Sequence, residues 1–343
     1  MATLAVRNRN LHGNVQTRQR HCAHSPDDIV RSAGRPVLRT LRNCAVSATL
    51  LLLGAVAPAA ALAKSGAAKP VATAPARNDT AQWCARLSER LPGVTSASCQ
   101  KQSLVATGAR SRNGFPILIR RFSPPKSRDL KNRDASHPPI RILLLGGIHG
   151  DELTASAIVF QWMKMIPNGA AQNFAWNVVP VLNPDGLLAA RPLRVNANGI
   201  DLNRNFPTPN WSVEAPRYWV KETGSDPRRF PGKVPLSEPE TRWVNDEMQR
   251  FKPQVIISVH APFGVLDFDG PAPAPRRFGR LVLNPVGVYP GSLGNYSGKF
   301  KNVPVITIEL PNALAMPTDA EAQKIWLDML DWLVQNTGKP APG

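Results

Sequence analysis

The sequence predicts an α/β domain of three layers, α/β/α, around a mixed and largely parallel central sheet. From residue 141 onward, short apolar runs alternate with amphipathic helical stretches, a rhythm typical of parallel strands covered by helices. Several of the runs are rich in β-branched residues, as buried strands are. The chain has 343 residues, 43% of them hydrophobic, which suffices for one large domain.

Two segments precede the predicted domain, which spans residues 80–338. Residues 1–63 place arginines before an apolar run that ends in Ala61-Leu62-Ala63, so we interpret them as a leader with a signal peptide. Residues 64–79 are rich in Ala, Pro and Lys and are expected to form a flexible linker. We therefore expect an exported, periplasmic protein without a stable membrane span after cleavage. An uncleaved membrane anchor is the alternative.

The elements expected inside the domain follow in order. A short helix is expected at 80–91, then a hairpin within 103–121 that turns at Asn113-Gly114, then a Pro-rich loop at 123–139. The later strands are expected at 141–145, 176–182, 255–259 and 303–308. The later helices are expected at 153–166, 237–251 and 318–335. The last two begin with possible capping boxes, formed by Ser237 with Glu240 and by Thr318 with Glu321.

The cysteines predict one disulfide. Of the four, Cys22 and Cys44 lie in the expected leader, and Cys84 and Cys99 remain in the domain. An even pair in an exported chain favours a bridge between them, and two free buried thiols are the alternative. Neither cysteine has the clustered spacing of a zinc site.

The formal net charge is +18, an excess that would favour polyanionic partners. The basic residues are scattered, and no helix-turn-helix, zinc-finger or aromatic-rich RNA-binding pattern accompanies them. We therefore expect no nucleic acid partner.

Three metal-ligand residues follow predicted strands. His149 and Glu152 come after the strand at 141–145, and His260 comes directly after the strand at 255–259. Sites in such sheets form at the carboxyl ends of strands. Two imidazoles and one carboxylate suit a catalytic Zn²⁺, which keeps one further position open for water. Hydrogen-bonded loop histidines are the alternative.

Glu309 ends the apolar run of the last predicted strand. A carboxylate there is costly unless it is paired or functional. Facing a metal-bound water, it would accept the proton on attack and pass it to the leaving amine. A salt bridge at the sheet edge is the alternative.

The segment 194–206 is dense in polar residues. An arginine fork binds carboxylates in bidentate fashion, so Arg204 with Asn203 would bind the terminal carboxylate of a substrate. Arg194 would stabilise a developing oxyanion, and Asp201 would orient a metal-binding histidine. Loop salt bridges are the alternative for each of them.

These residues resemble the motif set of the zinc carboxypeptidase family, which has a His-x-x-Glu pair, an Asn-Arg pair, a late histidine and a final glutamate. The resemblance covers roughly residues 103–335. It implies a zinc carboxypeptidase-like fold and one Zn²⁺ per chain, with His149, Glu152 and His260 as ligands. It also implies that Asp201 is the partner of a histidine ligand.

Within the family, the motifs GGIHGDE, NPDG, SEPET and ITIELP are similar to those of the murein peptide amidase branch. This similarity implies peptidoglycan-derived peptides as partners and cleavage between γ-D-glutamate and meso-diaminopimelate. Amidases of this branch are usually cytoplasmic, whereas this chain carries an export signal. The sequence does not indicate an oligomeric state.

Three further positions concern the substrate. Asp267 and Asp269 follow His260, and Asp267 is our choice to pair with the second ammonium of diaminopimelate; solvated loop carboxylates are the alternative. Of the two candidates for the substrate-capping tyrosine of the family, Tyr289 and Tyr296, we choose Tyr296. Asp151 occupies a position where digestive carboxypeptidases carry an arginine; it would contact a substrate amine or cap a helix.

Two other functions fit parts of the pattern. An N-acyl amino acid amidohydrolase similar to aspartoacylase or succinylglutamate desuccinylase shares the Gly-x-His-Gly-x-Glu pattern. A wall-binding protein on an inactive peptidase scaffold is the non-enzymatic alternative, but such proteins typically lose a ligand or the base. A carboxypeptidase that removes terminal diaminopimelate would use the same chemistry in another substrate register.

Overall fold

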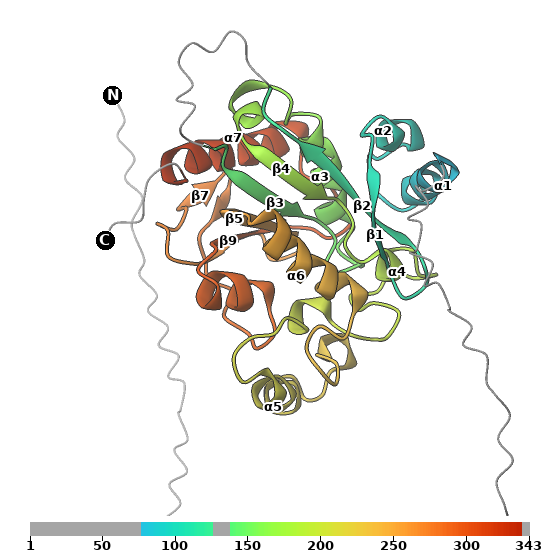
Figure 1. Ribbon diagram of the computed structural model, residues 1–343, viewed down its shortest axis with the longest axis vertical. Helices are drawn as coiled ribbons and strands as arrows, with labels where there is room; N and C mark the ends of the chain where they lie inside the picture. The colour runs from blue at the N-terminus through green and yellow to red at the C-terminus, as the bar shows by residue number, and fades with distance from the viewer. Residues whose placement is uncertain (1–76, 126–137, 338–343) are drawn as a thin grey trace, which may run out of the picture. The chain divides into compact units, whose positions relative to one another are not determined.

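The computed structural model describes residues 77–125 and 138–337. The expected leader and nearly all of the expected linker lie outside the described residues, as does most of the expected loop at 123–139. The fold class is the predicted one: a mixed sheet lies between two helical layers (Figure 1). In the described part of the chain, no helix combines the length and the apolar character needed to cross a membrane.

Seven strands form the central sheet in the order β1-β2-β4-β3-β5-β9-β6. The four central strands β4, β3, β5 and β9 run parallel. β2 and β6 flank them antiparallel, and β1 pairs antiparallel with β2 at the edge of the sheet. Their bounds are β1 Val105–Arg110, β2 Pro116–Phe122, β3 Arg141–Leu145, β4 Ala175–Val179, β5 Val255–His260, β6 Leu266–Asp269 and β9 Val305–Glu309. The predicted hairpin is the β1–β2 pair.

Alternate residues of the strands fill two separate cores. In β3, Ile142 and Leu144 face the core covered by α3 (Leu153–Met163) and α7 (Asp319–Asn336), whereas Leu143 and Leu145 face the core covered by α6 (Pro239–Phe251). Figure 1 shows α6 in front of the sheet and α3 and α7 behind it. Because both faces are buried, the central strands read as continuous apolar runs.

Shorter elements connect the layers. The helices are α1 Arg77–Ser88, α2 Ser96–Gln100, α4 Pro184–Leu187 and α5 Trp211–Thr223. The 3₁₀ segments are η1 Gly169–Asn173, η2 Leu202–Arg204 and η3 Pro227–Arg229, and η4 Gly294–Phe300 is a π-helical segment. A small separate hairpin consists of β7 Arg277–Phe278 and β8 Leu281–Val282.

The predicted disulfide joins Cys84 of α1 to Cys99 of α2, with Cα atoms 5.5 Å apart. Both cysteines are buried in the core that also includes α3 and α7. The bridge therefore ties the first two helices together where they pack on the domain.

One predicted capping box is wrong and the other is half formed. α6 begins at Pro239, and neither Ser237 nor Glu238 caps it through a side chain. Ser237 Oγ instead donates to Glu238 Oε1 at 2.7 Å. At α7, Thr318 Oγ1 accepts from the backbone of Glu321 at 3.3 Å. The Glu321 carboxylate does not complete the box, because it pairs with Arg280.

Candidate active site

The predicted metal ligands lie at the carboxyl ends of neighbouring parallel strands. His149 and Glu152 follow β3, and His260 is the last residue of β5. The loop after β3 must pass close to α4, since a Cβ atom on Gly150 would lie 2.3 Å from the carbonyl carbon of Gly186. Glycine at this position lets the loop turn His149 and Glu152 toward His260.

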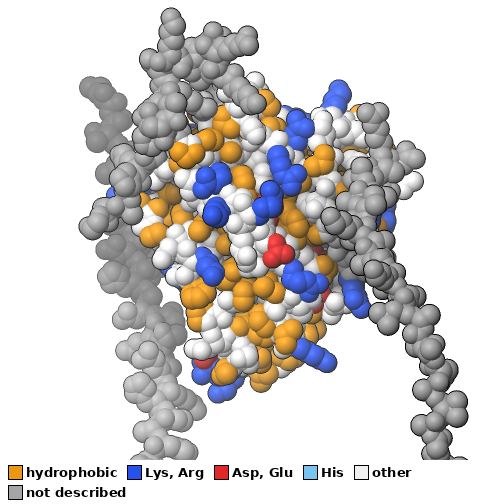
Figure 2. All heavy atoms as spheres, viewed as in Figure 1, with side chains coloured by type: hydrophobic (Ala, Val, Ile, Leu, Met, Phe, Trp, Pro, Cys, Tyr) orange, Lys and Arg blue, Asp and Glu red, His pale blue; other side chains and the backbone are white. Residues whose placement is uncertain are grey.

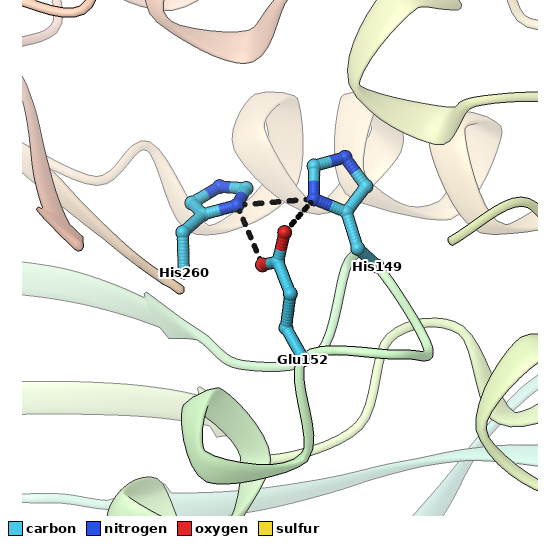
Figure 3. A group of neighbouring side chains, drawn as sticks. All are labelled: His149, Glu152 and His260. Carbon is cyan, nitrogen blue, oxygen red and sulfur yellow. Dashed lines mark hydrogen bonds and ion pairs between the residues drawn. The ribbon is translucent and has the colours of Figure 1, made fainter. Parts of the chain in front are cut away.

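The three side chains converge on one point (Figure 3). Their candidate ligand atoms all lie within 4.8 Å of one another. His149 Nδ1 lies 2.7 Å from Glu152 Oε1, and His260 Nδ1 lies 3.1 Å from Glu152 Oε2. The two Nδ1 atoms are 3.3 Å apart. All three residues are buried.

Each histidine is held through its other ring nitrogen. His149 Nε2 lies 3.1 Å from Asp201 Oδ1, and His260 Nε2 lies 3.0 Å from Ser258 Oγ. Such contacts fix the orientation of metal-binding imidazoles. Burial and Arg194 lower the pKa of His149, but the carboxylates of Glu152 and Asp201 outweigh them and raise it overall. The surroundings of His149 thus favour positive charge.

This donor set fits a zinc ion. Two ligands bound at about 2.1 Å in a tetrahedral site lie roughly 3.4 Å apart, close to the separations in the cluster. Burial by itself would raise the pKa of Glu152, but the two histidines hold it well below its usual range, so Glu152 is a carboxylate. Two imidazole nitrogens and one carboxylate oxygen are the ligands of many catalytic zinc sites.

Glu309 lies beside the cluster, as predicted. It is the last residue of β9 and is paired in register with His260 across the sheet. Its Oε2 atom is buried and has no hydrogen-bond partner among the described residues. Burial raises the pKa of Glu309, and the negative charge of Glu152 adds to this effect against the opposing histidines. A carboxyl group in this setting can hold and release a proton at the pocket.

Arg194 and Asp201 are paired with each other and contact the cluster. Arg194 Nε donates to Asp201 Oδ2 at 3.0 Å, and its Nη1 approaches Glu152 Oε1 at 3.5 Å. Burial raises the pKa of Asp201, but Arg194 and His149 reverse the effect, so the pKa lies well below its usual value. Asp201 is therefore ionised and can hold both neighbours.

Asn203 and Arg204 are placed by backbone contacts. Asn203 Oδ1 accepts from the backbone of Leu293 at 2.8 Å, and Arg204 Nη1 donates to the carbonyl of Asn203 at 2.7 Å. The Arg204 guanidinium lies 4.3 Å from the ring centroid of Tyr289. Its Nε atom is buried without a partner among the described residues, so this arginine retains an unused donor.

A pocket of about 430 Å³ contains the cluster and most of the predicted substrate residues. Asp267 and Asp269 line it from β6, together with Asn203 and Arg204. Burial raises the pKa of Asp267, and backbone hydrogen bonds to Phe268 and Val286 only partly oppose this. Asp269 is partly neutralised by Lys299, whose Nζ lies 3.5 Å from its Oδ1.

Tyr296 does not line this pocket, which corrects our choice between the two tyrosines. Its ring is buried and stacks on Phe206, with ring centroids 6.0 Å apart. Its hydroxyl donates to Asn245 Oδ1 at 2.6 Å. Tyr296 is therefore a packed core residue whose hydroxyl already has a partner. Tyr289 is the tyrosine at the pocket.

Sequence reasoning missed Arg228 and Arg229, which line the pocket from η3. It also expected Asp151 to contact a substrate amine or to cap a helix. No side chain caps α3, and Asp151 Oδ2 instead accepts from Arg228 Nη2 at 2.6 Å. The only sequence signals for this pair were the position of Asp151 next to Glu152 and the two arginines that follow Pro227.

The fold and the site together define a metal-dependent peptidase or amidase. The chain belongs to the zinc carboxypeptidase family, whose family model (Peptidase_M14) matches residues 82–266.

Two curated relatives are murein peptide amidases A. The one from Escherichia coli K12 is 28% identical over 206 residues, which cover 58% of this chain and 83% of that protein. The one from Vibrio campbellii is 30% identical over 178 residues, covering 50% and 69% respectively. Thrombin activatable fibrinolysis inhibitor is similar in fold, with a TM-score of 0.52, 15% identity and coverage of 74% and 71%.

Proposed function

We propose that this protein is a zinc-dependent amidase of cell-wall peptides that hydrolyses the bond between γ-D-glutamate and meso-diaminopimelate. The observation that carries the proposal is the convergence of His149, Glu152 and His260 beside Glu309, in a pocket that also contains Arg204 and Asp267. The similarity to murein peptide amidases A supports the substrate class.

His149, Glu152 and His260 would hold one Zn²⁺. When bound, zinc supplies a Lewis acid that makes water nucleophilic at neutral pH. Glu309 takes the proton of the attacking water and delivers it to the leaving nitrogen, a role that suits its raised pKa. Arg194 stabilises the developing oxyanion. Asp201 keeps His149 in its ligating orientation.

The leaving residue is bound at both of its ends. Asn203 and Arg204, which both line the pocket, bind its terminal carboxylate. Asp267, which also lines the pocket, pairs with the second ammonium of diaminopimelate. An aspartate is suited to this role because its burial is costly until a cation arrives.

Metal content and product identity test the proposal. The purified protein should hold close to one zinc per chain by elemental analysis, and removal by a chelator should abolish hydrolysis until zinc is restored. Mass spectrometry of L-Ala-γ-D-Glu-meso-diaminopimelate after incubation should show the dipeptide and free diaminopimelate. Cleavage of N-acetylaspartate in place of the tripeptide would favour the amidohydrolase alternative, and tight wall binding without hydrolysis would favour the inactive scaffold.

We also propose that the protein acts in the periplasm after removal of residues 1–63. The apolar run before Ala63 and the disulfide between Cys84 and Cys99 support export, since such bridges persist in oxidising compartments. N-terminal sequencing of the protein from the periplasmic fraction should start at residue 64. Recovery of the full-length chain in the cytoplasmic fraction would contradict the proposal.

A further inference from the structure

Arg228 lines the pocket from η3 and has no part in the proposed metal site or in binding the terminal carboxylate. We propose that it binds a second carboxylate of the substrate: the free α-carboxylate of the γ-linked D-glutamyl residue, on the acyl side of the scissile bond. Arg228 would therefore select peptides whose D-glutamyl α-carboxylate is free over peptides in which that carboxylate is amidated. The inference rests on the proposed function and extends it to the other half of the substrate.

The backbone around Arg228 is fixed by the rest of the site. Asp226 Oδ1 accepts from the backbone of Arg228 at 2.9 Å and caps η3. Trp219 Nε1 of α5 donates to the carbonyl of Asp226 at 2.7 Å. On the other side, the carbonyl of Phe230 accepts from the backbone of Asp201 at 2.9 Å. The segment that carries Arg228 is thus bonded to the residue that orients His149.

The side chain is held through one of its donors. Arg228 Nη2 donates to Asp151 Oδ2 at 2.6 Å, and Asp151 lies between the predicted ligands His149 and Glu152 in the chain. The Arg228 side chain is 62% exposed, which leaves the rest of the guanidinium open to solvent at the pocket. A guanidinium has five N–H donors and can bind a second carboxylate while it keeps the first.

Arg194, Arg204, Arg228 and Arg229 line the pocket. Arg194 is paired with Asp201. Arg204, which lies over Tyr289, is the arginine that we propose binds the terminal carboxylate. Arg228 is bound instead to the ligand loop through Asp151. In our proposal, a substrate held by Arg204 with its scissile amide at the cluster places its acyl residue beside that loop, where Arg228 contacts Asp151.

The chemistry of the linkage gives Arg228 something to recognise. A D-glutamyl residue linked through its γ-carboxyl keeps a free α-carboxylate next to the reacting carbon chain. When that carboxylate is replaced by a carboxamide, the γ linkage is unchanged and the charge is lost. A charge-assisted hydrogen bond is worth roughly 1.5–3 kcal/mol, so one such contact discriminates the two by about 10- to 100-fold.

Two tripeptides test this inference on the full-length zinc enzyme. One is L-Ala-γ-D-Glu-meso-diaminopimelate, and the other has the D-glutamyl α-carboxylate replaced by a carboxamide with the γ linkage kept. We expect the wild type to prefer the carboxylate by about 10- to 100-fold in kcat/KM. Arg228→Gln should lower kcat/KM on the carboxylate to about the level of the amide and change the amide less than about threefold.

Arg217→Gln is the matched control, since it removes an exposed arginine that is paired with Glu214 on α5 and should change neither substrate. Zinc content and thermal midpoint should be equal in all three proteins. Equal losses on both tripeptides in Arg228→Gln, or no preference in the wild type, would overturn the assignment of Arg228 alone. Failure of the wild type to cleave either tripeptide would overturn the proposed function and this inference with it.

Discussion

Two buried glutamates lie in the same pocket, and their surroundings move their pKa values in opposite directions. Glu152 contacts both histidines, and its pKa falls well below the usual range despite its burial. Glu309 has a buried oxygen without a partner among the described residues, and burial raises its pKa. Environment thus suits one carboxylate to metal ligation and the other to proton transfer.

This difference predicts a separation of function in Glu309→Gln. The substitution keeps the shape of the side chain but removes the proton acceptor, so kcat should fall by about 10²- to 10⁴-fold. Because Glu309 is not a proposed ligand, zinc should stay near one per chain by elemental analysis. Glu152→Gln is the contrasting variant and should lose the metal as well. An active Glu309→Gln enzyme, or one without zinc, would contradict the assigned role.

The position of Asp267 in the pocket predicts that it recognises the side chain of the leaving residue. In Asp267→Asn, kcat/KM for a tripeptide that ends in diaminopimelate should fall by about 10- to 100-fold, because one charge-assisted contact to the second ammonium is lost. A tripeptide that ends in 2-aminopimelate lacks that ammonium and should be affected little. Equal losses on both tripeptides would assign Asp267 a structural role only.

At the level of elements, local patterns predicted most of the central sheet. β3 spans residues 141–145, as expected, and the helices after β3 and before β5 lie where their periodicity placed them. β6 was missed because its four residues are paired with β9, about 40 residues downstream. α5 was missed because it begins after Asn210 in the left-handed conformation and contains Pro216, both of which weaken a helix signal.

In the site, too, the residues with a local sequence signal were predicted and those without one were missed. His149, His260 and Glu309 could be predicted because each residue type stands at the end of a strand, where parallel topology brings strand ends together. Tyr289 lines the pocket from a loop and Arg228 lines it from the short segment η3, and no local pattern fixes the path of such connections. The sequence could not show which of Tyr289 and Tyr296 reaches the pocket, and our choice of Tyr296 was wrong.

The first turn of α6 predicts a pH-dependent stability. Glu240 is buried, and burial raises its pKa to about 7, with the nearby Asp185 adding to the effect against Asn196. The folded state therefore keeps a proton that the unfolded state releases above its ordinary value of 4.5. Stability from this group is fully present below pH 4.5 and is lost as the pH rises through about 7.

Glu240→Gln should remove this loss. Between pH 4.5 and pH 8, the unfolding free energy of the variant should rise relative to that of the wild type by on the order of 2–3 kcal/mol. Denaturant titrations at each pH measure it, and the comparison cancels the titration of groups common to both proteins. Asp246→Asn is the control, since it removes an exposed carboxylate from the same helix. Parallel curves for wild type and Glu240→Gln would contradict a raised pKa.

Across the whole molecule, acidic and basic side chains occupy different places. Arg204 is the one lysine or arginine that is buried in the described part of the chain. The buried acids among those residues are Glu152, Asp185, Asp201, Glu238, Glu240, Glu247, Asp267, Asp269 and Glu309. Because the full chain carries a formal charge of +18, removing these acids from the surface leaves it more basic than composition suggests. On the face shown in Figure 2, the blue Lys and Arg side chains are more frequent than the red Asp and Glu side chains.

This separation predicts salt-sensitive attachment to the polymer that carries the substrate. Cell-wall peptides have free carboxylates, so the exposed arginines should attract them over distances of about the Debye length, roughly 10 Å at 0.1 M salt. The experiment uses the Glu309→Gln variant, so that the wall is not digested. The fraction of this protein that sediments with insoluble wall should fall steeply as NaCl rises from about 50 to 500 mM. Replacing the exposed Arg112 and Arg121 by glutamate should lower binding at low salt and leave kcat on the soluble tripeptide unchanged, because neither residue lines the pocket. Sedimentation that is independent of salt would indicate that the pocket alone holds the wall and that the basic surface has no part in it.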